Sequence, residues 1–309
     1  MLISICIPTY NSGDKLNRLL DSIQLQSFKD FEIIISDDSS NADVKENIEK
    51  HYSHLQIKYY YNQQPLGTPS NWNNAVAKSS GEWIKIMHHD DWFNGNDALL
   101  TFANAIKINN KAKLIFCSYK NVNLDNGNTY DVIATSFDIF LLKQNYINLF
   151  KNFIGNPSCT LIHSSIKPYN YDASIKWFID FDFYLWYFKT YKFFTYIKAP
   201  LITFAIHKNQ VTAQVQNNPT IEIPETFLLF EKYGISLLHN IFAYDFFWRM
   251  FRNLKLKNID EVEQYLGKKN TYDAVADLIK IQNSGINKYL HIGIVSKIIM
   301  LYAYTKNRV

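Results

Sequence analysis

The 309-residue sequence has few cysteines and no dense basic cluster. Cys6, Cys117 and Cys159 form an odd set without CxxC spacing, and each lies in apolar or strand-like surroundings. These cysteines are therefore best interpreted as small buried hydrophobic residues in a reducing compartment. The net charge of +4 is spread along the chain, so the sequence argues against nucleic acid as a partner.

Long apolar segments are also missing. No uninterrupted run approaches the roughly 20 residues that a helix needs to cross a bilayer. The longest candidate, 292–304, is broken by Ser296 and Lys297. The chain opens directly on a strand pattern, without a charged leader or a cleavage site. These features predict a cytoplasmic protein.

Two common ligand-binding motifs are absent as well. No GxGxxG follows the first predicted strand, and no GxxxxGK[ST] occurs, so phosphate charge would have to be neutralised by a metal ion. The paired histidines His88 and His89 could suggest a hydrolytic zinc site. However, the HExxH spacing typical of such sites is missing, which disfavours that interpretation.

Hydrophobic residues, at 47% of the chain, are sufficient for a sizeable core. In the first 90 residues, short apolar runs alternate with segments of helical period, such as Leu16, Leu19, Leu20 and Ile23. This alternation predicts an α/β fold with a mainly parallel, doubly wound sheet and flanking helices. The predicted strands are 3–7, 31–35, 57–61 and 83–87.

Polar side chains gather at the ends of these predicted strands. In a parallel sheet the carboxyl ends of the strands lie at one edge, where ligands bind. Ionised carboxylates there can accept hydrogen bonds from a base or ribose and can ligate Mg²⁺ or Mn²⁺. The residues are Pro8, Thr9 and Tyr10 after the first strand, Asp37 and Asp38 after the second, and His88, His89, Asp90 and Asp91 after the fourth.

Three motifs in this region resemble those of family 2 glycosyltransferases with the GT-A fold. They are SICIPTYN at 4–11, IIISDDSS at 33–40 and NWNNAVAKSSGEWIKIMHHDDW at 71–92. The resemblance covers the first 95 residues well and extends more loosely to about residue 210. It implies inverting transfer of a hexosyl group from a nucleotide-sugar, most commonly a UDP-sugar, to a polysaccharide or lipid-linked oligosaccharide acceptor.

The resemblance also implies roles for individual residues. Asp90 corresponds to the metal-bridging carboxylate of the Asp-x-Asp signature, whereas His88 stands where the family usually has the first aspartate. Mg²⁺ or Mn²⁺ is therefore expected, with His88 and His207 as further ligands. The nucleotide-binding residues implied are Pro8, Thr9, Tyr10, Asp37, Asp38, Asn71, His89 and Asp90.

The acceptor half is expected beyond residue 95. Asn156-Pro157-Ser158 precedes a predicted strand at 159–163 and resembles an acceptor-side segment of the family. Asp180 matches the catalytic aspartate, and a carboxylate in aromatic surroundings has a raised pKa suited to a general base. Acceptor-binding roles are assigned to Asp91, Asp182 and Trp177.

Other interpretations of these residues stay open. Asp37 and Asp38 could form only a turn that caps the next helix. Asp180 and Asp182 could simply complement a helix dipole. The altered signature at His88 would also suit a non-catalytic nucleotide-sugar binding or scaffold protein.

The last third of the chain changes character. Helical patterns follow one another from residue 216 to 309, after a predicted glycosyltransferase domain at 1–215 with a nucleotide-binding half (1–95) and an acceptor half (96–215). The aromatic segment 241–251 is followed closely by basic residues such as Lys255 and Lys257. This helical appendage could contact the inner face of the plasma membrane, form a homodimer or cap the catalytic domain.

Overall fold

The computed structural model describes residues 1–167, 169–206, 215–285 and 287–306, and the chain divides into two units. Unit 1 consists of Met1–Phe140 and Phe153–Lys208, and unit 2 of Leu141–Asn152 and Asn209–Val309. A single boundary near residue 215 was predicted from the sequence. The assignment of 141–152 to the helical unit was not predicted.

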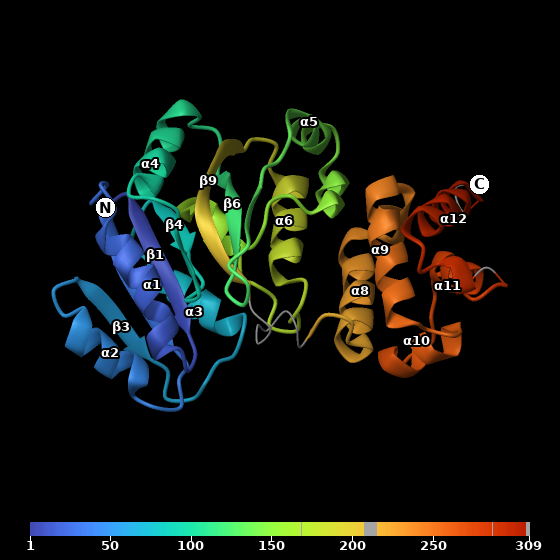
Figure 1. The fold of residues 1–309 in the computed structure, drawn as a ribbon, viewed down its shortest axis with the longest axis horizontal. Helices are drawn as coiled ribbons and strands as arrows, with labels where there is room; N and C mark the ends of the chain where they lie inside the picture. The colour runs from blue at the N-terminus through green and yellow to red at the C-terminus, as the bar shows by residue number, and fades with distance from the viewer. Residues whose placement is uncertain (168, 207–214, 286, 307–309) are drawn as a thin grey trace. The chain divides into compact units, whose positions relative to one another are not determined.

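The described strands of unit 1 form a nine-stranded sheet in the order β3-β2-β1-β4-β8-β6-β9-β5, with β7 paired to β6 (Figure 1). The strands are β1 (Ile3–Thr9), β2 (Phe31–Asp37), β3 (Ile57–Tyr61), β4 (Trp83–Ile86), β5 (Asp91–Phe93), β6 (Leu114–Asn123), β7 (Thr129–Val132), β8 (Thr160–His163) and β9 (Thr195–Ile206). Strands β1 to β4 pair in parallel, as the sequence predicted. In the other half only β6 and β9 are parallel, because β8, β7 and β5 run antiparallel to their neighbours.

Helices of unit 1 cover this sheet (Figure 1). They are α1 (Gly13–Gln24), α2 (Asp43–His51), α3 (Ser70–Ala77), α4 (Ala98–Ile108), α5 (Ser136–Gln144), which runs on into unit 2, and α6 (Ile179–Thr190), with 3₁₀ turns η2 (Pro157–Cys159) and η3 (Ser164–Ile166). The predicted apolar face of α1 is completely buried at Leu16, Leu19, Leu20 and Ile23. Every residue of β1 is buried too, as expected for a parallel strand with helices on both faces.

The turn before β4 requires glycine. The Gly81 N–H donates to the Ser4 hydroxyl at 2.7 Å, and a Cβ atom at Gly81 would lie 2.7 Å from the Ser4 backbone nitrogen. This close approach sets β4 beside β1. The strand order reverses at β1, which has β2 on one side and β4 on the other, and such a reversal opens a ligand crevice at the carboxyl ends of the strands.

Unit 2 is helical in its described part. Its elements are η1 (Tyr146–Lys151), α8 (Pro219–Tyr233), η4 (Ile235–His239), α9 (Ile241–Leu254), α10 (Ile259–Leu266), α11 (Asp273–Gln282), η5 (Asn287–Tyr289) and α12 (Gly293–Lys306). The η1 turn packs on α9 through Phe150, whose ring centroid lies 5.3 Å from that of Phe246 and 5.2 Å from that of Phe247. Across the described residues, every helix is too short or too polar to cross a membrane.

Candidate functional site

Asp37 ends β2 and anchors the loop that follows. Its Oδ1 accepts hydrogen bonds from the Thr9 hydroxyl (2.9 Å), the Ser39 N–H (3.0 Å) and the Ser39 hydroxyl (2.5 Å), and its Oδ2 accepts one from the Tyr59 hydroxyl (2.6 Å). The side chain is completely buried. Through these four hydrogen bonds, Asp37 joins the ends of β1, β2 and β3. Direct contact of Asp37 with a nucleoside stays a prediction.

Asp38 lies at the same edge of the sheet and makes fewer contacts. Its carboxylate accepts from Asn62 Nδ2 at 2.7 Å and from the Gly67 N–H at 2.8 Å. Asn71 joins this network because Asn62 donates to its Oδ1 at 3.2 Å, while Asn71 itself donates to the Thr9 carbonyl at 3.2 Å. Helix α2 has no side-chain cap, so neither Asp37 nor Asp38 acts as the predicted helix cap.

His88, Asp90 and Asp91 form a cluster that could hold a metal ion. Each offers one ligand atom, and these atoms all lie within 4.8 Å of one another. Burial lowers the pKa of His88 and raises the pKa of Asp91, and the charge of Asp90 raises the pKa of Asp91 further. His88 Nε2 is buried and has no hydrogen-bond partner among the described residues. An unpaired imidazole nitrogen beside two carboxylates suits Mn²⁺ and is compatible with Mg²⁺.

The 3₁₀ turn η2 holds this cluster in place through hydrogen bonds. Asn156, which caps η2, donates through Nδ2 to Asp91 Oδ2 at 2.8 Å and lies 3.3 Å from His88 Nδ1. The His88 N–H donates to the Ser158 hydroxyl at 3.0 Å. Lys85 is completely buried and donates to the carbonyls of Ser158 and Thr160, and burial lowers its pKa to about 8. The lysine on β4 thus fixes the turn that orients the cluster.

Asp180 lies in the first turn of α6, where burial raises its pKa to about 6. Tyr171 and Tyr184 are near enough that the Asp180 charge adds to the burial that raises the pKa of both phenols. The Tyr171 ring packs edge-on against Trp72, with centroids 5.4 Å apart, and the Trp72 ring packs against His88 at 4.9 Å. The rings of Tyr171 and Trp72 therefore link the surroundings of Asp180 to the cluster that contains His88.

The other predicted nucleotide-binding residues lie at the end of β1. The His89 ring hydrogen-bonds the Pro8 backbone, and burial lowers the pKa of His89. Tyr10, in contrast, is 58% exposed. The structure therefore places His89 beside Pro8 at the carboxyl end of β1 and leaves the Tyr10 ring exposed to solvent.

The remaining predicted residues are less closely grouped. Asp182 is buried and accepts a hydrogen bond from the Tyr169 hydroxyl at 3.1 Å, whereas Trp177 is half-buried beside Phe178. Acceptor contacts of Asp91, Asp182 and Trp177 stay predictions. His207 lies outside the described residues.

Comparison with known proteins identifies the family. The sequence model of Glycosyl transferase family 2 matches residues 4–178, more than half of the chain. The chain belongs to glycosyltransferase family 2. The enzyme is 40% identical over 93 residues to the GalNAc(5)-diNAcBac-PP-undecaprenol beta-1,3-glucosyltransferase of Campylobacter jejuni, a match that spans 29% of this chain and 29% of that protein.

Solved structures of glycosyltransferases share the fold. Residues 1–349 of Staphylococcus aureus TarS in complex with UDP-GlcNAc superpose with a TM-score of 0.61 at 16% identity, covering 93% of this chain and 92% of that one. The mannosyltransferase PcManGT of Pyrobaculum calidifontis, in complex with GDP-Man and Mn²⁺, gives a TM-score of 0.52 at 15% identity, covering 99% and 86%. The glycosyltransferase therefore has the GT-A-type architecture that the sequence motifs implied.

Several residues of the site were missed by sequence reasoning. Lys85 offered a signal, because a lysine inside the apolar run 83–87 must find buried partners. Asn156 and Ser158 were noted only as part of an acceptor-side segment, and Tyr59 only as part of a strand. Their partners lie more than 20 positions away, so no local pattern reveals these contacts.

Proposed function

We propose that this glycosyltransferase moves a sugar from a UDP-linked donor to a hydroxyl group of a lipid-linked oligosaccharide or surface polysaccharide, with inversion at the anomeric carbon. The observation that carries the proposal is the pair of packed rings, Tyr171 and Trp72, that joins the surroundings of Asp180 to His88. A UDP donor is supported by the UDP-GlcNAc bound to TarS, and a lipid-linked acceptor by the name of the Campylobacter relative. The reaction would take place at the cytoplasmic face of the membrane.

His88, Asp90 and Asp91 would hold Mg²⁺ or Mn²⁺. The unpaired His88 Nε2 and the adjacent carboxylates fit such an ion, and a fold relative binds Mn²⁺. When bound, the ion would neutralise charge on the diphosphate of the donor. Asn156 keeps Asp91 in place by donating to its Oδ2.

Asp180 would act as the general base. In an inverting transfer, the acceptor hydroxyl loses its proton as its oxygen bonds to the anomeric carbon and the nucleoside diphosphate departs. A carboxylate whose pKa is raised to about 6 takes that proton more readily than an ordinary aspartate and is still ionised at neutral pH. Asp38 and Asn71 would line the nucleoside pocket at the end of β2.

Asp90→Ala tests the proposed metal site, and Asp180→Asn tests the proposed general base. Turnover of UDP-glucose, UDP-GlcNAc and GDP-mannose is measured with Mn²⁺, and UDP binding is measured by calorimetry with and without the ion. We expect Asp90→Ala to lose metal-dependent UDP binding. We expect Asp180→Asn to bind UDP normally while its turnover falls about 10²- to 10⁴-fold.

Asp97→Asn provides the control, because Asp97 is exposed and hydrogen-bonds Ser27. This variant should match the unmodified enzyme in both assays. Normal turnover in Asp180→Asn would exclude Asp180 as the base. An unchanged response of UDP binding to Mn²⁺ in Asp90→Ala would remove Asp90 from the metal site.

A further inference from the structure

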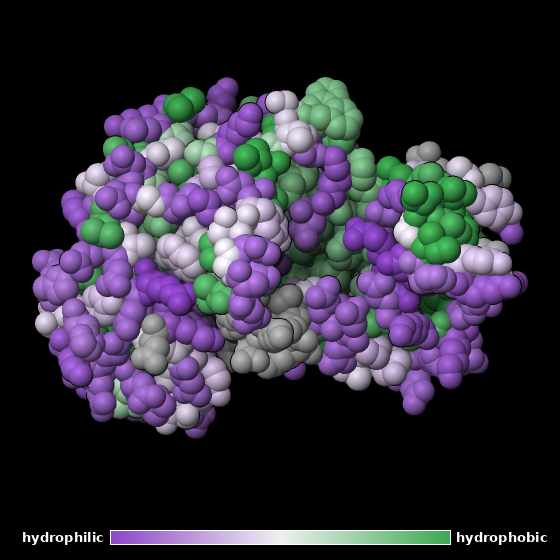
Figure 2. Space-filling view, viewed as in Figure 1, coloured by the Kyte–Doolittle hydropathy of each residue, from purple (hydrophilic) through white to green (hydrophobic). Residues whose placement is uncertain are grey.

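Helix α12 presents an apolar face to solvent. Ile294, Ile298, Leu301 and Tyr302 are 76%, 61%, 44% and 63% exposed. At 3.6 residues per turn, these four side chains fall within an arc of about 100° on one side of the helix. Figure 2 shows a hydrophobic patch where Figure 1 places α12. We call these four residues the outer face of α12.

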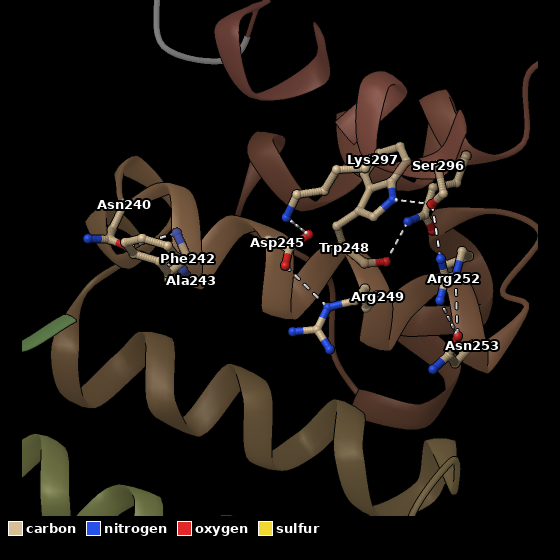
Figure 3. A network of polar contacts seen from close by, with 11 residues as sticks. Asn240, Phe242, Ala243, Asp245, Trp248, Arg249, Arg252, Asn253, Ser296 and Lys297 are labelled. Carbon is tan, nitrogen blue, oxygen red and sulfur yellow. Dashed lines mark hydrogen bonds and ion pairs between the residues drawn. The ribbon is translucent and has the colours of Figure 1, made fainter. Parts of the chain in front are cut away.

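The opposite face of α12 is fixed to α9. The Ser296 hydroxyl accepts hydrogen bonds from Trp248 Nε1 at 3.1 Å and from Arg252 Nη1 at 3.0 Å, as Figure 3 shows. Further along the helix, the Tyr304 hydroxyl donates to the His239 carbonyl at 2.7 Å. These contacts hold α12 to α9 and to η4 through residues outside its outer face.

Two lysines flank the outer face, in a part of the chain that is basic in sequence. Residues 278–309 contain five Lys or Arg residues and no Asp or Glu. By helical geometry, Lys297 and Lys306 lie at the two edges of the outer face. Lys297 shares Asp245 with Arg249, at 2.8 Å and 3.3 Å, so this group of three keeps a net positive charge (Figure 3).

A basic cavity adjoins α12 in the chain. It has a volume of about 930 Å³, and Leu290 and His291, which lead into α12, line it. Its basic lining residues are Arg252, Lys255, Lys257 and Lys288. None of the described residues that line the cavity is acidic. Such a cavity suits a phosphate group, and residues 290–291 connect it along the chain to the start of α12.

We propose that the outer face of α12 and this basic cavity form a docking surface for an anionic phospholipid bilayer. The four apolar side chains enter the boundary between headgroups and acyl chains, while the exposed lysines, Lys257, Lys288, Lys297 and Lys306, lie at the level of the lipid phosphates. A second copy of the chain fits this surface less well. In a twofold dimer the same patch meets itself, which would bring two basic surfaces together.

Vesicle co-sedimentation of the full chain tests the proposal. Vesicles of phosphatidylcholine alone are compared with vesicles that also contain phosphatidylglycerol, without any sugar nucleotide. We expect binding only to the anionic vesicles and weaker binding at higher salt. The double variant Ile298→Asp/Tyr302→Asp should lower partitioning at least about ten-fold. Lys257→Gln/Lys288→Gln should lower it roughly five-fold per lysine.

Matched controls come from α4. Ile108 is 80% exposed, and Lys107 beside it is exposed as well, so Ile108→Asp and Lys107→Gln should leave vesicle binding unchanged. The proposal is overturned if anionic vesicles are not bound, or if the α12 double variant binds them as well as the unmodified protein. It is also overturned if light scattering shows a dimer that Ile298→Asp/Tyr302→Asp dissociates.

The vesicle assay is independent of the proposed reaction. A protein that binds vesicles but transfers no sugar would leave the docking surface intact and refute only the proposed function. Sugar transfer to a water-soluble acceptor without vesicle binding would do the reverse.

Discussion

Asn156 donates a hydrogen bond to Asp91 at 2.8 Å across 65 positions of the chain. This bond ties the turn before β8 to the first residue of β5, and so to the cluster of His88, Asp90 and Asp91. The amide stabilises the ionised form of Asp91 against the burial that raises its pKa. A residue outside the acidic signature therefore influences whether the site can hold a cation.

Replacing Asn156 with alanine should weaken metal binding. Removal of the donor raises the pKa of Asp91 further, so a proton competes more strongly with the cation. Outer contacts of this kind typically change metal affinity about 10- to 100-fold. Titration with Mn²⁺, followed by electron paramagnetic resonance, measures the change. Asn145→Ala is the control, because Asn145 caps η1 by accepting from the Ile147 N–H, as Asn156 caps η2 by accepting from the Ser158 N–H, and belongs to unit 2. Equal Mn²⁺ affinity in both variants would contradict this role.

Replacing Lys85 with methionine should destabilise unit 1 and loosen the site. The substitution leaves the buried carbonyls of Ser158 and Thr160 without their donor, at a cost of about 1–3 kcal/mol for each unpaired group. We expect a lower free energy of unfolding in urea together with weaker Mn²⁺ binding. Lys107→Met on the surface of α4 should change neither. Full stability of Lys85→Met would show that the turn does not depend on the lysine.

Gly155 should not tolerate alanine. Its φ angle is +85°, and an added Cβ would lie 2.8 Å from Tyr119 Cε1. Gly127 has a φ of +75° and open space around it, so a substitution there separates backbone strain from the steric clash of an added Cβ. Gly127→Ala bears only the backbone strain, roughly 1 kcal/mol, whereas Gly155→Ala also displaces the Tyr119 ring and crowds Cys159 Sγ. Thermal unfolding and turnover should therefore fall more in Gly155→Ala, and equal losses in both variants would disprove the steric part.

The rate of sugar transfer should depend on pH through Asp180. A base works when ionised, and burial raises the pKa of Asp180 from 3.8 to about 6. We therefore expect kcat to fall as the pH drops below about 6, a loss that an aspartate of ordinary pKa would show only near pH 4. Assays from acidic to neutral pH at saturating donor and metal measure this profile. A flat profile from pH 5 to 7 would argue against Asp180 as the base.

Much of unit 1 could be predicted from periodicity. The spacing of Leu16, Leu19, Leu20 and Ile23 predicts the buried face of α1, and the apolar runs predict β1 to β4 because parallel strands are buried on both sides. The family and the GT-A-type fold implied by the motifs are confirmed. Strand direction in the second half could not be predicted, because β8 has the same local pattern whether it runs parallel or antiparallel to β4.

The candidate site was predicted in its residues more than in their contacts. The motif placed Asp37 and Asp38 together in sequence. Only the fold shows that the Asp37 carboxylate accepts hydrogen bonds from Thr9, Ser39 and Tyr59, while the Asp38 carboxylate has fewer partners. Hydrogen bonds of this kind join different strands. They depend on how the sheet is assembled and leave no local periodicity in the sequence.

Residues 141–152 belong to unit 2 but lie in the chain between the two parts of unit 1, which limits how this enzyme can be divided. Since Phe150 packs on Phe246 and Phe247, a chain cut after residue 208 would strip η1 of its neighbours and leave that aromatic ring in water. The backbone crosses between the units at three points, so no single cleavage yields two self-sufficient halves. The helices after residue 208 are thus not a detachable tail, and recombination between related genes would have to exchange both pieces at once to preserve a foldable product.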